Sequence, residues 1–168
     1  MTSLNKFSSL SGLSTKKWGP SAWNFLFSSI MGSYPPIINI NDFQHIKIKN
    51  EFKNLFSSLQ YTMPCIFCRE SYKKYWIELP IDDYMDSRIN MMKWLYMIKD
   101  KVNKKLMLQE NELFKIEKNK INAIYKKKDI TREKYDKIIQ KLKNKICITK
   151  KSIPFINVLN NFESIRAK

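Results

Sequence analysis

Two cysteines separated by two residues, Cys65 and Cys68, are the residues of this chain best suited to chemistry. They follow Pro64 and lead directly into the segment from Arg69 to Trp76, for which the sequence predicts a helix. On the first turn of a helix, two such thiols can close into a disulfide. The unpaired N–H groups and the positive end of the helix dipole stabilise a thiolate there. The same spacing supplies half of many zinc sites, so the motif alone predicts redox chemistry with metal binding as the alternative.

The composition indicates a helical protein with a core of its own. The chain has 168 residues, of which 43% are hydrophobic, and it contains only three glycines and six prolines. This is enough apolar material for one domain, whereas all-β folds need more turn residues. We therefore expect an all-α fold.

The formal net charge of +16 favours association with nucleic acid, acidic proteins or anionic membranes. Lysine dominates over arginine, and lysine, isoleucine and asparagine are all abundant, as an AT-biased coding sequence would produce. Solvated helix faces explain most of this charge. Nucleic-acid binding is therefore kept as a possibility that the composition does not favour.

The three cysteines are too few for a disulfide-stapled secreted domain, and one is left over when the Cys65–Cys68 pair closes. No apolar run is long enough to span a bilayer, and the N-terminus lacks the apolar stretch of a secretory signal. We expect a soluble intracellular protein without a membrane span.

Apolar residues at helical spacing predict four helices ahead of the charged part of the chain. The second has Asp42 as its cap, and the third carries the cysteines and stops before Leu79 and Pro80. The predicted helices begin at Trp18, after Asp42, at the cysteine motif and at Ser87.

The chain divides into four expected parts. A flexible arm covers residues 1–17, and a four-helix core covers residues 18–106. A lysine-rich helical hairpin covers residues 107–150, with its turn at Lys126 to Asp129. A C-terminal amphipathic helix covers residues 151–168, starts at Pro154 and docks on the core.

The order of several motifs resembles the Erv/ALR family of FAD-linked sulfhydryl oxidases. The resemblance covers about residues 18–106 and the last helix. The WGPxxW motif and the tail after Pro154 look most like those of the family members from large DNA viruses. The motifs are Trp18-Gly19-Pro20-x-x-Trp23, Tyr34-Pro35, Pro64-Cys65-x-x-Cys68, Trp94-Leu95 and Asn103-x-x-Leu106.

The resemblance implies a four-helix bundle that holds FAD beside the Cys65–Cys68 disulfide. Cys65 would exchange with the substrate dithiol, and Cys68 would face the flavin. Geometry favours the same roles, because Cys65 starts the helix, where substrate thiolates can reach it, and Cys68 lies a turn inward. Electrons would pass from a substrate dithiol to the cysteine pair, to FAD and then to oxygen, giving hydrogen peroxide.

The resemblance also implies the cofactor contacts. Trp23 sits where the family places an aromatic ring on the flavin, although core packing would explain Trp23 and Val102 without the resemblance. The family usually has histidine where this chain has Phe27, and His-Asn where it has Lys99 and Asp100. No metal ligand is expected. The implied FAD-contacting residues are Trp23, Phe27, Tyr34, Lys99, Asp100, Val102, Asn103 and Lys105.

The implied partners are molecular oxygen and a protein dithiol substrate, either thioredoxin-like or a virion protein. A homodimer is a further candidate, and a viral member would work in the host cytoplasm, the virus factory or the virion. The alternative function is a non-catalytic helical protein that binds zinc or nucleic acid. A zinc set would have to come from Cys65, Cys68, Cys147 and His45, whose spacing argues against it. For the lysine-rich hairpin, a solvated insertion is favoured over a docking site for an acidic partner or nucleic acid.

Overall fold

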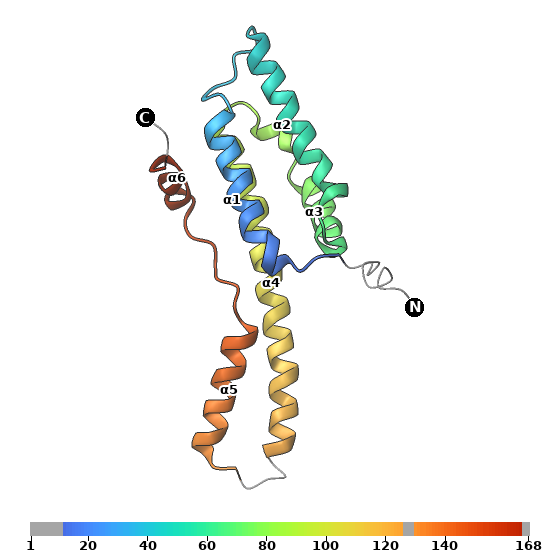
Figure 1. The fold of residues 1–168 in the computed structure, drawn as a ribbon, viewed down its shortest axis with the longest axis vertical. Coiled ribbons are helices and arrows are strands. Elements are labelled where there is room, and N and C mark those ends of the chain that lie inside the picture. The colour runs from blue at the N-terminus through green and yellow to red at the C-terminus, as the bar shows by residue number, and fades with distance from the viewer. Residues whose placement is uncertain (1–11, 126–129, 166–168) are drawn as a thin grey trace, which may run out of the picture. The chain divides into compact units, whose positions relative to one another are not determined.

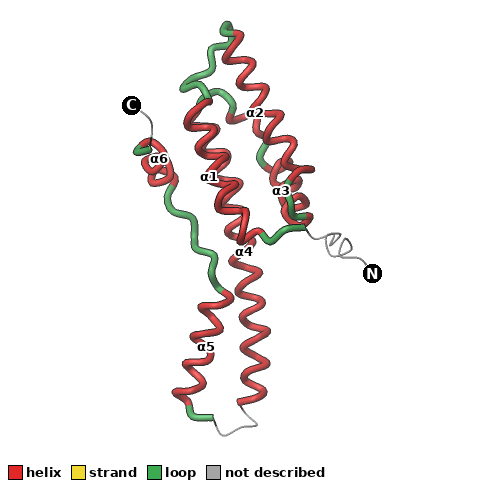
Figure 2. The backbone as a smooth tube through the Cα atoms, viewed as in Figure 1, coloured by secondary structure: helices red, strands yellow, loops and turns green. Residues whose placement is uncertain are grey.

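The computed structural model describes residues 12–125 and 130–165, and all regular secondary structure in these ranges is helical, as Figures 1 and 2 show. The expected all-α fold is thus confirmed. The elements in chain order are α1 (Thr15–Ser33), α2 (Phe43–Thr62), α3 (Ile66–Glu78), the 3₁₀ turn η2 (Ile81–Tyr84), α4 (Arg88–Tyr125), α5 (Arg132–Ile146) and α6 (Phe155–Glu163).

The chain divides into two compact units, and the first boundary between them along the sequence falls within α4. The first unit contains residues 1–98 and 153–168, and the second contains residues 99–152. In the first unit α1, α2, α3 and the beginning of α4 form a bundle (Figure 1). In the second unit the rest of α4 and α5 run side by side as a helical hairpin (Figure 2). The turn expected at Lys126 to Asp129 lies outside the described residues.

Helix α1 begins at Thr15, earlier than the expected start at Trp18, and Pro20 lies inside it. The sequence rule that places proline in the first turn is therefore wrong here. Contacts from outside the helix hold the earlier turn. The Leu13 N–H donates to the Pro64 carbonyl oxygen at 2.6 Å, and the Trp18 indole N–H donates to the Leu13 carbonyl oxygen at 3.3 Å.

Helices α2 and α3 begin and end as the sequence predicts. The Asp42 carboxylate caps α2 by accepting hydrogen bonds from the backbone N–H groups of Gln44 and His45. Helix α3 ends at Glu78, directly before Leu79 and Pro80.

Helix α4 does not stop near Leu106 but continues without a break to Tyr125. The expected separate first helix of the hairpin is thus the second part of α4. No glycine or proline occurs between Arg88 and Tyr125, so nothing in the sequence ends the helix. The change from apolar to lysine-rich composition marks a change of environment along one helix.

Aromatic rings dominate the core of the first unit. Phe56 and Trp94 are fully buried and meet edge-on with their ring centroids 4.9 Å apart. Trp76 contacts the Trp94 ring in the same manner at 5.9 Å. Edge-to-face pairs of this kind stabilise a core beyond the burial of their area. These rings join α2, α3 and α4.

Two buried aromatic residues of the first unit, Tyr34 and Trp94, bond to backbone oxygens through their polar atoms. The buried Tyr34 hydroxyl donates to the Met85 carbonyl oxygen at 2.8 Å, and the Trp94 indole N–H donates to the Leu79 carbonyl oxygen at 3.0 Å. Because buried polar groups are costly when unpaired, these bonds fix how the connection from α3 to α4 lies against the core.

Helix α6 belongs to the first unit. The Phe162 ring stacks on Phe27 of α1, and the Phe155 ring contacts Tyr96 of α4. The Tyr96 hydroxyl also donates to the Ile153 carbonyl oxygen just before α6. Two α6 rings thus link it to two helices of the bundle. The proposed division of the chain at residues 106 and 150 stays a prediction.

A hydrophobic stretch of membrane-spanning length is missing from every helix in the described ranges.

We expect Phe56→Ala to lower the free energy of unfolding by about 3–5 kcal/mol, because the deletion leaves a cavity against Trp94. Urea denaturation followed by circular dichroism measures the change. Phe25→Ala is the matched control, because the Phe25 side chain is 62% exposed and its removal should change stability by less than about 0.5 kcal/mol. Equal losses for the two variants would contradict this account of the core.

Candidate redox site

The cysteine pair stands at the beginning of α3. Cys65 is the N-cap residue, with an extended backbone, and Cys68 lies in the first turn. The Cys65 sulfur accepts a hydrogen bond from the Cys68 backbone N–H at 3.3 Å. The Cys65 carbonyl oxygen accepts from the N–H groups of Cys68 and Arg69 at 3.2 and 3.1 Å. The sulfur of Cys65 thus occupies the place of a capping oxygen, where the helix terminus favours negative charge.

Residues 63–65 connect α2 to α3, and donors from elsewhere bond to the backbone oxygens of Met63 and Pro64. The Arg69 guanidinium donates to the Met63 carbonyl oxygen at 2.5 Å, and the Leu13 N–H donates to the Pro64 carbonyl oxygen at 2.6 Å. Sequence reasoning found neither contact. Arg69 directly follows the motif, but Leu13 lies far from it in sequence and gave no signal.

Cys65 is the more buried of the two thiols. Its side chain and backbone are only 7% exposed, whereas Cys68 is half-buried. The geometric expectation that Cys65 is the more accessible cysteine is therefore wrong. The physical reason is the segment before α1, since Gly12 forms an antiparallel bridge with Cys65. The roles of the two cysteines stay a prediction.

The aromatic residues of α3 differ in exposure. Phe67, between the two cysteines, is 67% exposed. Tyr72 is buried, donates its hydroxyl proton to the Phe56 carbonyl oxygen at 3.0 Å and contacts Trp76. Burial raises the pKa of the Tyr72 phenol far above its ordinary value, so this hydroxyl stays protonated and structural.

Trp23 and Phe27, two of the expected cofactor contacts, are neighbours on α1. Their ring centroids are 6.5 Å apart. Trp23 is half-buried, whereas Phe27 is only 2% exposed and stacks on Phe162 of α6 at 5.5 Å. Phe162 was missed as part of this site because only its place on an amphipathic helix was visible in the sequence.

Tyr34, the third expected contact on this side, is fully buried directly after α1. Its hydroxyl bonds to the Met85 carbonyl oxygen, and its ring meets Phe52 edge-on. Burial raises the pKa of the Tyr34 phenol, and the Asp86 carboxylate raises it further. These contacts give Tyr34 a role in the core.

The other expected contacts lie on α4 in the second unit. Asp100 forms an ion pair with Lys104 at 2.7 Å, and the Asn103 side-chain amide donates to the Ser152 hydroxyl at 3.0 Å. Burial raises the pKa of Asp100, but hydrogen bonds from Lys104 and Ser152 outweigh it and leave the pKa below its ordinary value. Asp100 and Asn103 are thus brought together around Ser152, a residue that sequence reasoning missed.

Three further residues of this group are half-buried on the same helix: Lys99, Val102 and Lys105. Burial lowers the pKa of the Lys99 ammonium. A lysine that has lost part of its hydration is suited to an anionic ligand, although burial against the helix hairpin also explains the shift.

The zinc alternative gains no support from the described residues. In that part of the chain no cluster of three or more His, Cys, Asp or Glu side chains could hold a metal ion. His45 accepts a hydrogen bond from the Asn39 N–H through its Nδ1 atom. Cys147 lies in the second unit, with its sulfur near the Glu110 carbonyl oxygen and the Asn111 side chain.

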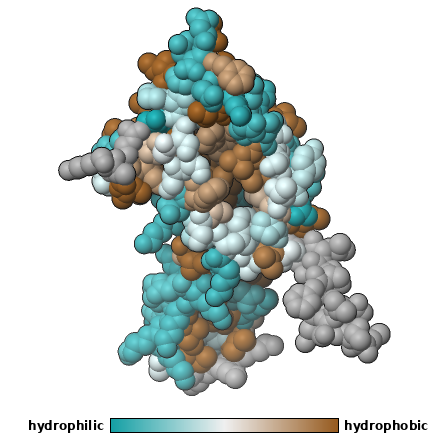
Figure 3. Space-filling model, turned by 45° about the horizontal axis from the view of Figure 1, so that its top comes forward, coloured by the Kyte–Doolittle hydropathy of each residue, from teal (hydrophilic) through white to brown (hydrophobic). Residues whose placement is uncertain are grey.

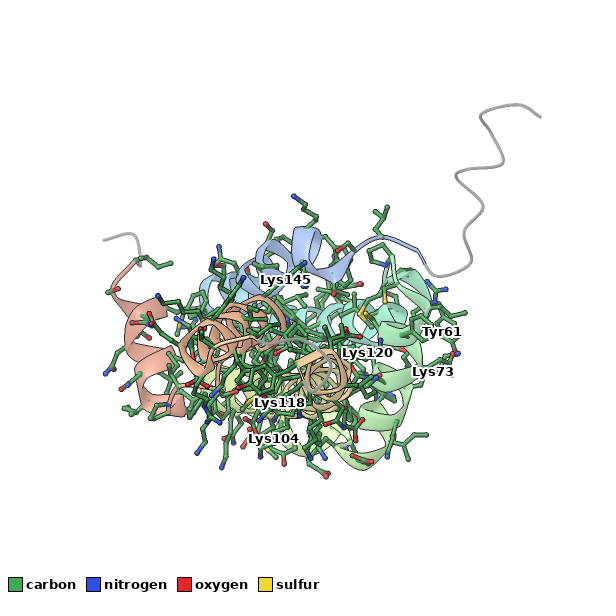
Figure 4. The ribbon with its side chains drawn as sticks, turned by 90° about the horizontal axis from the view of Figure 1, so that it is seen from below. Tyr61, Lys73, Lys104, Lys118, Lys120 and Lys145 are labelled. Carbon is green, nitrogen blue, oxygen red and sulfur yellow. The ribbon has the colours of Figure 1, made fainter. Side chains whose placement is uncertain are left out.

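The lysine-rich surface belongs to the second unit, where teal hydrophilic residues surround smaller apolar areas in the lower part of Figure 3. Figure 4 labels Lys104, Lys118, Lys120 and Lys145 in this unit. Lys104 and Lys120 pair with the acidic residues Asp100 and Glu117. Such pairing within one helix is typical of solvated helix faces and agrees with that interpretation of the charge.

Comparison with known proteins relates this arrangement to one family. No curated protein matches the sequence. The crystal structure of yeast Erv1 core is similar, with 25% sequence identity and a TM-score of 0.47, over 63% of this chain and 82% of that one. The model of the Erv1 / Alr family matches residues 20–126, which is more than half of the chain and includes the cysteine motif. This chain belongs to the Erv1 / Alr family.

Proposed function

We propose that this protein is an FAD-linked sulfhydryl oxidase that forms disulfides in protein substrates. Two substrate thiols lose two electrons and two protons, and molecular oxygen accepts them to give hydrogen peroxide. The observation that carries the proposal is the Cys65–Cys68 pair at the N-terminus of α3, within the part of the chain that matches the Erv1 / Alr family.

Cys65 and Cys68 are the proposed catalytic residues. In the oxidised enzyme a substrate thiolate attacks one sulfur of the pair, and the other sulfur leaves as a thiolate. The N-terminus of α3 supports this step, because its N–H groups and dipole stabilise the negative charge that appears on the leaving sulfur. Following the family resemblance, Cys65 exchanges with the substrate and Cys68 faces the cofactor.

The chemistry of the available side chains fits the parts of FAD. Trp23 offers an aromatic face for the ring system, backed by Phe27. On α4, Lys99 and Lys105 offer positive charge for the pyrophosphate, and the Asn103 amide offers a donor and an acceptor for adenosine. When bound, FAD supplies a two-electron carrier between a dithiol and oxygen.

The burial of Phe27 supports different roles for Phe27 and Trp23, the two aromatic residues on α1. Because Phe162 already stacks on Phe27, this ring holds Trp23 and α6 in place and does not offer a free face. Trp23, which is half-buried, is the ring that can contact a flavin directly.

The proposed substrates are protein dithiols, either thioredoxin-like or virion proteins, and the enzyme would work as a homodimer. The viral resemblance of the WGPxxW motif supports a disulfide-forming role in a large DNA virus. Its place would then be the host cytoplasm, the virus factory or the virion.

The purified protein should be yellow and should consume oxygen when dithiothreitol is added. Cys65→Ser and Cys68→Ser should each lower the rate of oxygen consumption to background, because either change removes the disulfide. Cys147→Ser is the matched control and should keep the wild-type rate. Cys147 is not expected to take part, because a disulfide between Cys147 and Cys65 or Cys68 would break up the active pair. An oxygen electrode measures all four proteins.

A preparation that is colourless, and stays colourless after refolding with FAD, would contradict the proposal. So would wild-type turnover in the Cys68→Ser variant. Lost turnover in Cys147→Ser would contradict the expectation that Cys147 is dispensable.

The roles within the pair can be separated without the cofactor. In a Cys147→Ser background, Cys68→Ser leaves Cys65 as the only thiol, and Cys65→Ser leaves only Cys68. After incubation with glutathione disulfide, the protein with Cys65 alone should hold a stable glutathione adduct, because no second thiol can release it. Mass spectrometry detects the adduct. The absence of a glutathione adduct on the protein with Cys65 alone would contradict the assignment of Cys65 as the exchanging thiol.

A further inference from the structure

The segment before α1 lies along the backbone of the redox motif. Gly12 forms an antiparallel bridge with Cys65, and the Leu13 N–H donates to the Pro64 carbonyl oxygen at 2.6 Å. Gly12 has a φ of 79°, and a Cβ atom there would lie only 2.0 Å from the Pro64 carbonyl oxygen. Only glycine combines this backbone conformation with so close an approach.

This segment covers Cys65, and two hydrogen bonds hold Leu13 in place. Cys65 is 7% exposed, while Leu13, which bonds to Pro64, is 67% exposed. Besides the bond to Pro64, the Trp18 indole N–H holds the Leu13 carbonyl oxygen at 3.3 Å. In the proposed reaction a substrate thiolate must reach the Cys65 sulfur, so the cover has to move when a substrate arrives.

Removal of the cover would expose an extended backbone edge that another chain can use. Cys65 has extended dihedral angles (φ −137°, ψ 121°), and the Pro64 carbonyl oxygen points to the donor that Leu13 now supplies. Phe67 and Tyr61, which flank this edge in the sequence, are 67% and 71% exposed. Figure 4 shows Tyr61 beside Lys73, whose ammonium group lies 5.4 Å from the ring centroid. Addition of an extended peptide to such an edge uses main-chain hydrogen bonds, with apolar side chains nearby for selectivity.

We infer that the Pro64–Cys65 edge is the docking site for an extended, cysteine-bearing segment of the protein substrate. Gly12 and Leu13 are the intramolecular occupant that the substrate replaces. The inference rests on the proposed function, because it concerns the substrate of the same cysteine pair.

The chemical step follows from this docking. A substrate thiolate attacks the Cys65 sulfur, the Cys65–Cys68 bond breaks, and Cys68 leaves as a thiolate. A mixed disulfide then joins the substrate to Cys65. The second substrate thiolate attacks the substrate sulfur of that bond, which closes the substrate disulfide and releases Cys65 as a thiolate. Two electrons have then moved from the substrate to the cysteine pair.

The first test measures the cover and needs no turnover. In the variant with Cys65 as the only thiol, the rate of alkylation by N-ethylmaleimide reports access to its sulfur. Gly12→Ala places a Cβ against the Pro64 oxygen and should raise this rate several-fold. Gly19→Ala is the matched control, because a Cβ there meets nothing within 4 Å, and it should leave the rate unchanged. Leu13→Pro, which removes the N–H donor to Pro64, serves as a second variant if Gly12→Ala does not fold.

The second test measures the docking site. A short peptide whose single cysteine is linked to thionitrobenzoate reacts with Cys65 through the mixed disulfide described above and releases a coloured thiolate. A set of copies of this peptide is then made, each N-methylated at a different residue beside the cysteine. One of these copies lacks the N–H donor that would replace the Leu13 N–H. We expect one of these copies to react several-fold more slowly than the parent peptide with the Cys65-only protein.

Equal alkylation rates in Gly12→Ala and Gly19→Ala would overturn the inference. Equal reaction of all N-methylated copies and the parent peptide would overturn it as well. Both results are independent of oxygen consumption, so a failure of the oxidase proposal with dithiothreitol is distinguishable from a failure of the docking site.

Discussion

The structure of the redox site depends on the connection of three residues between α2 and α3. In so short a link residues 63–65 lie outside both helices, and their backbone oxygens must find donors of their own. Arg69, Leu13 and the first N–H groups of α3 supply those donors. Three parts of the chain therefore hold the motif: the first turn of α3, the Arg69 side chain and the segment that precedes α1.

This arrangement makes Cys65 part of the helix start itself. Its sulfur caps α3 in place of an oxygen by accepting a hydrogen bond from the Cys68 N–H. The burial of the same residue comes from the segment before α1, where Gly12 forms an antiparallel bridge with Cys65. The hydrogen bonds that start α3 and the bridge that covers Cys65 therefore meet at one residue.

The aromatic core supplies the rigid support for this site. Phe56, Trp94 and Trp76 join the helices on both sides of the connection, and the Tyr72 hydroxyl ties α3 to the α2 backbone. Helix α4 extends from this core into the lysine-rich hairpin, where no residue in the described ranges is fully buried. The first unit therefore has a tightly packed core, whereas the second is held by half-buried contacts and by ion pairs along its helices.

The sequence by itself determined the helical class, the cap at Asp42, the end of α3 and the place of the cysteine pair at a helix start, because these follow from local rules of capping and periodicity. The length of α4 was also readable in the absence of glycine and proline, although the change in composition at Leu106 concealed it. Tertiary structure alone decided the early start of α1, the burial of Cys65 and the stacking of Phe162 on Phe27. Each of these brings together residues that are far apart in the chain, and local spacing carries no information about such contacts.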